Sequence, residues 1–184
     1  MSRFFDALER VATGRGVLLL FLVVVVVDGV LIGWVAPRIA AGSDGGRPLD
    51  ISLVYSADEA YERLAAFSDE TRSFYLATEL TLDMVFPAAY SVFFAALILF
   101  LLRRGGGTRG RLLALLPIAT MCADFLENAA IATLLVRYPE RLDGVASAAG
   151  ILTLAKWVLV GVTVGAIVFA WAMGRSTTTA SDAR

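Results

Sequence analysis

Long apolar runs separated by short polar segments dominate the pattern of the chain. Four runs are long enough to cross a hydrocarbon core of about 30 Å, which takes about 20 residues of helix. We predict transmembrane helices at residues 17–35, 74–102, 111–136 and 146–173, which together cover more than half of the 184 residues. The expected fold class is an all-α integral membrane protein, a four-transmembrane-helix bundle in one domain, residues 1–184.

The segments between the runs carry helix signals of their own. Residues 2–16 have the amphipathic pattern of a helix that lies on a membrane surface. In the 36–72 segment, a capping box at Ser56 predicts a helix over 57–67, and Ser68 predicts the start of the second long helix. The bundle is therefore expected to carry a short helical segment between its first two helices.

Arginine placement predicts the orientation of the helices. The N-terminus, the 103–111 segment and the C-terminal tail hold nine arginines against three acids, whereas the 36–72 and 137–143 segments hold six arginines against nine acids. Positively charged segments stay on the cytoplasmic side. We therefore expect a multi-pass protein of the cell membrane with both termini in the cytoplasm and the 36–72 segment outside. The arginine-rich 103–111 run is interpreted as a cytoplasmic turn, and no nucleic-acid partner is predicted.

Composition excludes several kinds of chemistry. The sequence has no histidine and a single cysteine, Cys122. Histidine general bases, histidine metal ligands and histidine haem ligands are therefore excluded, and one cysteine cannot form a disulfide framework. We predict no metal site and no cofactor.

Charged residues inside the apolar runs are the strongest signal for function. An ionised side chain at mid-bilayer costs roughly 3 kcal/mol on insertion scales, so such residues face the bundle interior and are commonly functional. Pro87 also cannot donate to the carbonyl of Asp83, which leaves that oxygen free within the second run. The predicted ligand-binding residues are Asp28, Tyr75, Glu79, Asp83, Tyr90, Asp124, Glu127, Asn128, Lys156 and Trp157.

Helical spacing supports the convergence of these residues. Tyr75, Glu79, Asp83 and Tyr90 fall on one stripe of the second run. Asp124 and Asn128 share a stripe of the third run with Glu127 beside it, and Trp157 adjoins Lys156 in the fourth. In the first run, Gly29 and Gly33 share a face that would let a neighbouring helix approach beside Asp28.

The balance of these charges has a consequence for binding. Five acids against one lysine leave a formal charge of −4 in a medium of low dielectric constant. Either some carboxyl groups hold or share protons, or a bound cation balances them. The charged groups fall at or outward of the predicted midplane, which indicates a cavity open to the outer side.

Two resemblances rest on these residues. The motif Tyr75-x-x-x-Glu79-x-x-x-Asp83 with Pro87, followed by Asp124-x-x-Glu127-Asn128 and Lys156-Trp157, resembles a family of uncharacterised bacterial four-helix membrane proteins. A weaker similarity is to the EXPERA superfamily of sterol isomerases and the sigma-2 receptor, through Asp28, Glu79-Leu80, Pro87 and Trp157. This chain has Tyr75 and Leu154 where the isomerases have histidine and asparagine, so the second resemblance implies a binding pocket rather than isomerase activity.

We predict a protein that binds a small amphipathic or cationic ligand, or a lipid, in an acidic pocket in the outer half of the bundle. The alternatives are an acid–base enzyme acting on a membrane lipid, a proton- or cation-coupled carrier, and a structural assembly subunit. Membrane lipids are expected partners. Whether the chain is an enzyme, and whether it is an oligomer, stays open at this point.

The predicted orientation can be checked by cysteine labelling in a Cys122→Ala background. Cysteines placed at Gly106 and Thr179 should be shielded from an impermeant reagent in intact cells, because they lie in the positively charged segments. A cysteine at Gly45 should react. If a cysteine at position 106 reacted with the impermeant reagent in intact cells, the orientation would be the opposite of the predicted one.

Overall fold

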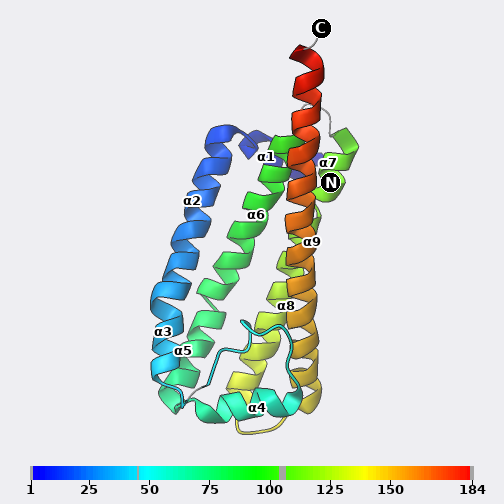
Figure 1. Ribbon diagram of the computed structural model, residues 1–184. Coiled ribbons are helices and arrows are strands. Elements are labelled where there is room, and N and C mark those ends of the chain that lie inside the picture. The colour runs from blue at the N-terminus through cyan, green and yellow to red at the C-terminus, as the bar shows by residue number, and fades with distance from the viewer. Residues whose placement is uncertain (1, 45, 104–106, 183–184) are drawn as a thin grey trace. The chain divides into compact units, whose positions relative to one another are not determined.

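The computed structural model describes residues 2–44, 46–103 and 107–182 (Figure 1). Gly45 and Gly106, two of the labelling positions, lie outside the described residues. Over the described residues the chain is helical, and its only β pairing is an isolated bridge between Ser43 and Phe67. The helices are α1 (Ser2–Val11), α2 (Gly14–Val30), a π-helical turn (Leu31–Val35), α3 (Ala36–Ala41), α4 (Ala57–Ala66), α5 (Asp69–Glu79), α6 (Leu82–Leu102), α7 (Gly107–Leu113), α8 (Leu116–Arg137) and α9 (Asp143–Asp182).

Four stretches are long and apolar enough to cross a membrane, as the sequence predicts. They are Gly14–Ala41, Asp69–Leu102, Gly110–Arg137 and Asp143–Met173. The first extends beyond its predicted end at residue 35, because the π-helical turn passes directly into α3. Pro37 lies in the first turn of α3, directly after the π-helical turn, and has no N–H to donate to that turn.

The second stretch is interrupted where the sequence predicts continuous helix. The N–H of Thr81 bonds to the carbonyl of Thr78, and the hydroxyl of Thr81 donates to the carbonyl of Ala77 at 2.6 Å. A threonine side chain that competes for backbone groups in this way favours a turn over regular helix. The α5–α6 break therefore lies at Leu80 and Thr81, whereas α6 continues through Pro87.

The chain divides into two compact units, each with apolar cores of its own. Unit 1 consists of Met1–Val24, Ala88–Met121 and Val158–Arg184, and unit 2 consists of Val25–Pro87 and Cys122–Trp157. The division falls inside α2, α6, α8 and α9. That residues 1–184 form a single domain stays a prediction.

In unit 1, the amphipathic α1 packs by its apolar side. Phe5 and Leu8 are buried together with Ala95 and Leu99 of α6. The hydroxyl of Ser91 also donates to the carbonyl of Pro117 at 2.7 Å, which joins α6 to α8 by a buried polar contact.

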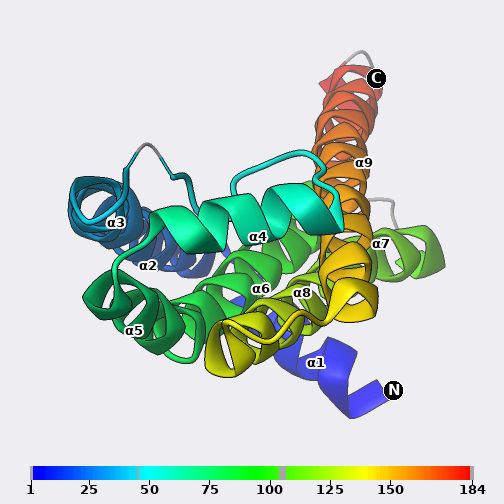
Figure 2. The ribbon, with the colours of Figure 1, turned by 90° about the horizontal axis from the view of Figure 1, so that it is seen from below.

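In unit 2, α4 lies across the ends of the longer helices (Figure 2). The expected capping box is present, because the Ser56 hydroxyl accepts from the backbone of Glu59 and the Glu59 carboxylate accepts from the backbone of Ser56. Ser68 likewise caps α5 as predicted. The buried side of α4 holds Tyr61 and Leu64, and the Tyr61 hydroxyl donates to the carbonyl of Glu140 at 3.1 Å.

The capping box predicts a specific dependence of stability on pH. Hydrogen bonds from Ser56 lower the pKa of the Glu59 carboxyl. A lowered pKa in the folded state stabilises the fold above the unfolded value of about 4.3, and this contribution is lost as the pH falls through the folded value. Glu59→Gln keeps the capping geometry and removes the charge.

The wild type should therefore melt at a higher temperature than Glu59→Gln at about pH 6, and the difference should narrow as the pH falls below about 4. Thermal unfolding in detergent at both pH values measures this. Glu62→Gln, an exposed change in the same helix, is the control and should give no such convergence. A difference between wild type and Glu59→Gln that is constant with pH would contradict the interpretation.

Candidate functional site

The buried ammonium of Lys156 is the centre of a polar cluster in unit 2. Lys156, the only lysine in the sequence, is 8% exposed on α9. Its Nζ lies 2.6 Å from Oε2 of Glu127 and 3.7 Å from Oδ1 of Asp124, both on α8. The expected approach of Asp124 and Lys156 is confirmed, and Glu127 is the nearer partner.

Glu127 is held by a second contact from α9. The Thr153 hydroxyl, fully buried, donates to Oε1 of Glu127 and lies 2.9 Å from the carbonyl of Ala149 one turn earlier. Thr153 and Lys156 are three residues apart, so they share a helix face and reach the same carboxylate. The pair of contacts fixes the position of α9 against α8.

The segment between α3 and α4 folds onto this cluster. The Lys156 ammonium donates to the carbonyl of Asp50 at 3.1 Å. The Tyr75 hydroxyl donates to Oδ1 of Asp50 at 2.6 Å and accepts from the backbone N–H of Leu49 at 2.9 Å. Leu49 is fully buried, so this part of the 36–72 segment enters the interior of unit 2.

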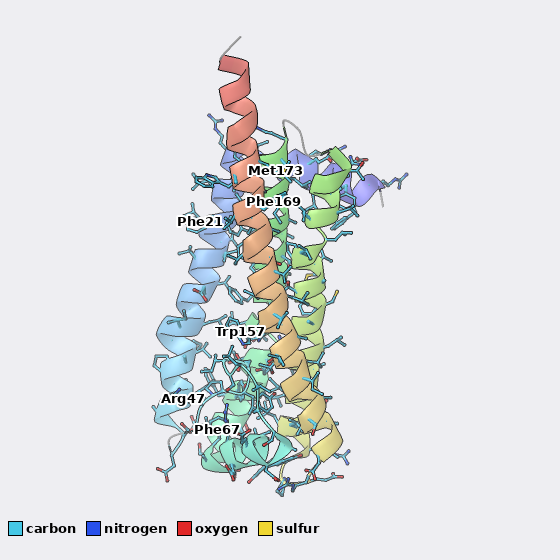
Figure 3. The ribbon with its side chains drawn as sticks, turned by 45° about the vertical axis from the view of Figure 1, so that its right-hand side comes forward. Phe21, Arg47, Phe67, Trp157, Phe169 and Met173 are labelled. Atoms are coloured by element: carbon cyan, nitrogen blue, oxygen red, sulfur yellow. The ribbon has the colours of Figure 1, made fainter. Side chains whose placement is uncertain are left out.

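Two further contacts hold the same segment. The indole N–H of Trp157, labelled in Figure 3, donates to the carbonyl of Ser52 at 2.9 Å. The carbonyl of Tyr55 approaches α9 at Gly150, where a Cβ atom would lie 2.3 Å from that oxygen. Glycine is required at this position because any side chain would displace the segment.

The backbone carbonyl of Asp83, to which Pro87 cannot donate, accepts a hydrogen bond from another helix. The side-chain amide of Asn128 on α8 donates to the backbone oxygen of Asp83 on α6. The predicted stripe on α8 is thereby connected to the predicted stripe on α6.

Two buried polar groups of unit 2 have no hydrogen-bond partner among the described residues. Glu79 is 0% exposed, and neither of its carboxylate oxygens is bonded. The Tyr55 hydroxyl is also buried and makes no hydrogen bond within 3.5 Å to a described residue, although the Thr153 hydroxyl lies nearby. Burial, together with the negative charges of Glu127 and Asp50, raises the pKa of the Tyr55 phenol, so the group stays a neutral donor. The Tyr75 hydroxyl, whose proton is directed at Asp50, also lies near the Glu79 carboxyl group.

These groups form one electrostatic unit, which we name the acid cluster. Asp50, Asp83 and Glu127 lie close enough to Glu79 to repel it, and Asp124 and Lys156 act on Asp83. The described residues include no group of three acidic or cysteine side chains arranged to hold a metal ion. The acid cluster consists of Asp50, Glu79, Asp83, Asp124 and Glu127, with a formal charge of −4 once Lys156 is included and all six are ionised.

None of the contacts described above joins Asp28 or Tyr90 to the acid cluster. Asp28 is half-buried on α2, a helix that buries none of its residues, and it makes no hydrogen bond or ion pair with another described residue. Tyr90 belongs to unit 1, where its ring packs near Phe94. The expected close approach at Gly29 and Gly33 is wrong, because a Cβ atom at either would meet nothing within 4 Å. The helix that carries Gly29 buries none of its residues, so this face has no close described neighbour.

Sequence reasoning missed Asp50 and Tyr55. Both lie in the segment between α3 and α4, which has no helical period to indicate a buried face. A signal was available in the apolar residues around the acid, Leu49, Ile51, Leu53 and Val54. An aspartate inside such a run is a candidate for burial in the same way as an acid inside a transmembrane run.

The chain was compared with protein-family models, with curated proteins and with solved structures, and none of the three comparisons gave a match. Its similarity to four-helix membrane proteins and to the EXPERA superfamily therefore stays an expectation from the motifs. What the geometry establishes is an all-helical chain, over its described residues, with four helices able to cross a membrane and a buried acid cluster in unit 2.

Proposed function

We propose that this multi-pass membrane protein binds a small amphipathic cation at the acid cluster of unit 2. The single observation that carries the proposal is the carboxylate of Glu79, fully buried with both oxygens unbonded among the described residues. A buried polar group without a partner costs about 1–3 kcal/mol, and more when charged. An ammonium or guanidinium group offers the donors that this carboxylate lacks.

The charge of the cluster favours the same class of ligand. Lys156 is bonded to Glu127 and to the carbonyl of Asp50, so its positive charge is already committed. Among the described residues, neither Glu79 nor Asp83 forms an ion pair, although the charge of Lys156 acts on Asp83. A ligand with one positive charge would offset the repulsion between them.

The surroundings of Glu79 favour an organic cation with an apolar part. The acids do not form a metal-binding geometry among the described residues. Tyr55 and Tyr75 line the cluster with aromatic rings, and the unbonded Tyr55 hydroxyl supplies a donor for a polar group of the ligand. Aromatic faces also attract ammonium groups.

Octylammonium is a suitable probe, with octanol as its neutral counterpart. In thermal unfolding of the full-length protein in detergent, octylammonium should raise the melting temperature in a concentration-dependent way and octanol should not. Glu79→Gln should weaken the apparent affinity for octylammonium at least tenfold, because a hydrogen bond to a charged group contributes about 1.5–3 kcal/mol.

Glu62→Gln on the exposed side of α4 removes the same charge outside the cluster and serves as the matched control. It should bind octylammonium as the wild type does. Equal stabilisation by octylammonium and octanol, or an unchanged affinity in Glu79→Gln, would reject the proposal.

A second experiment separates the structural ion pair from the binding site. Lys156→Met should lower the free energy of unfolding by about 3–5 kcal/mol, since it leaves a buried carboxylate without its cation. Adding Glu127→Gln should restore most of this loss, because both charges of the pair are then gone and the glutamine oxygen can still accept from Thr153.

The matched double variant is Lys156→Met with Asp124→Asn. It should recover less, because Asp124 is the more distant partner at 3.7 Å. Chemical unfolding in mixed micelles measures all four proteins. Equal recovery by the two double variants would mean that Glu127 is not the principal partner of Lys156.

A further inference from the structure

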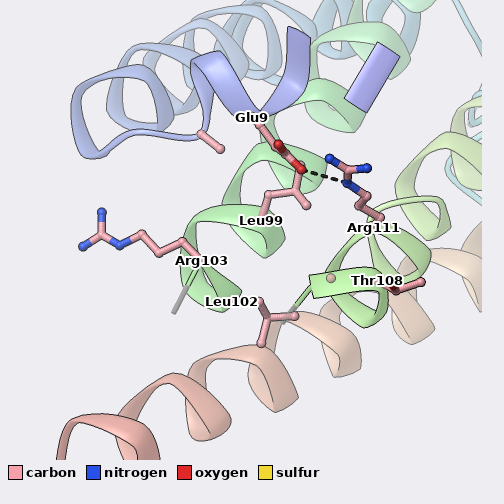
Figure 4. Close-up of a pocket in the computed structure, with 8 residues that line it drawn as sticks. Glu9, Leu99, Leu102, Arg103, Thr108 and Arg111 are labelled. Carbon is pink, nitrogen blue, oxygen red and sulfur yellow. Dashed lines mark hydrogen bonds and ion pairs between the residues drawn. The ribbon is translucent and has the colours of Figure 1, made fainter. Parts of the chain in front are cut away.

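Unit 1 contains a pocket that is separate in composition from the acid cluster. Its volume is about 510 Å³, within the range of small-molecule sites. Figure 4 shows it between α1, the end of α6 and α7. The lining residues are Glu9, Ala12, Leu99, Leu102, Arg103, Thr108, Gly110 and Arg111.

The position of these residues in the sequence places the pocket at the membrane–water boundary. Leu99 and Leu102 form the last turn of the second apolar stretch, and Gly110 and Arg111 begin the third. Ala12 comes two residues before the first stretch starts at Gly14. Residues at the ends of three such stretches lie where lipid headgroups lie.

The walls of the pocket differ in chemistry. Leu99, Leu102 and Ala12 give it an apolar side. Arg111 is bonded to Glu9 at 2.9 Å, which neutralises part of its charge and anchors α1 to α7. Arg103 is exposed, its guanidinium lies 4.4 Å from the centre of the Phe100 ring, and it has no carboxylate partner among the described residues.

On the polar side, the guanidinium of Arg111 is paired with Glu9, whereas the guanidinium of Arg103 is not paired with a described carboxylate. A guanidinium binds phosphate through paired hydrogen bonds, and Thr108, on the Arg111 side of the pocket, adds a hydroxyl to the lining (Figure 4). Basic pockets between helices at this depth are suited to anionic lipid headgroups. An acyl chain has a matching surface in Leu99 and Leu102.

We propose that this pocket, lined by Arg103, Arg111 and the apolar end of α6, binds the phosphate of an anionic phospholipid headgroup. The lipid would connect α1 to the ends of α6 and α7. The site is independent of the acid cluster, so failure of either proposal leaves the other standing.

The test uses the full-length protein extracted from vesicles that contain equal amounts of phosphatidylglycerol and phosphatidylcholine. Native mass spectrometry should find more bound phosphatidylglycerol than phosphatidylcholine. Arg103→Glu should lower this ratio at least fivefold, because one arginine near anionic lipid contributes about 1 kcal/mol, which corresponds to about fivefold in binding. Arg103 is exposed and pairs with no described acid, so the change removes its contact with the Phe100 ring but breaks no ion pair with a described residue.

Arg15→Glu is the matched control. Arg15 is exposed and lies at the start of the first apolar stretch, three residues after Ala12 of the pocket, but it does not line the pocket. It should change the ratio less than twofold. Equal retention of the two lipids, or equal losses in Arg15→Glu and Arg103→Glu, would overturn the proposal. Complete displacement of phosphatidylglycerol by excess inorganic phosphate would assign the pocket to a soluble phosphate compound and would also overturn it.

Discussion

The ammonium of Lys156 needs compensation because it is buried in a chain that is largely apolar, and the arrangement of unit 2 follows from how that compensation is made. Glu127 and Asp124 reach it from α8, and the carbonyl of Asp50 reaches it from the segment between α3 and α4. Three parts of the sequence more than a hundred residues apart at their extremes thus meet at one charge. A buried ion pair does not by itself make a fold stable, but loss of one partner is costly. The contact is best understood as a fixed point of register between α8, α9 and the entering segment.

Other polar side chains of unit 2 bond backbone oxygens that the helices leave without a partner. The hydroxyl of Thr81 takes up a carbonyl at the α5–α6 break, and Asn128 takes up the carbonyl that Pro87 leaves free. In an apolar medium these backbone oxygens must be bonded, since no water is available to them. Glu79, the last residue of α5, is the exception: it is buried beside the break without a hydrogen-bond partner among the described residues. The weaker acceptors are thus bonded while this carboxylate has no hydrogen bond to a described residue, and that contrast is the basis of the proposed binding function.

The two proposed sites differ in the physics of binding as well as in charge. Three acids of the cluster are buried and two, Asp50 and Asp83, are half-buried, so interactions there are less screened than at the surface and sensitive to single contacts. The pocket of unit 1 lies at the ends of the apolar stretches, where water and salt screen its arginines. Selectivity at the acid cluster depends on which polar groups have no hydrogen bond. Selectivity at the pocket depends on a guanidinium and an apolar wall lying side by side.

The sequence by itself determined whatever depends on near neighbours in the chain. The four apolar stretches follow from length and hydropathy, the starts of α4 and α5 from Ser56 and Ser68, and the free carbonyl of Asp83 from Pro87. Asp124 and Lys156 were predicted to meet because each is too costly to expose to lipid, and this constraint holds whatever the packing.

Only the tertiary structure decided the rest. Asp50 and Tyr55 join the cluster because their segment folds into unit 2, and an irregular segment has no period that reveals its buried side. Asp28 stays outside because α2 buries none of its residues, although its own stretch predicts burial as strongly as the others. Glu127 rather than Asp124 is the nearer partner of Lys156 because a long flexible side chain reaches carboxylates on more than one stripe of a helix, so spacing along α8 cannot rank them. In each case the outcome depends on which helix packs beside which, and that is set by the sum of many contacts distant in sequence.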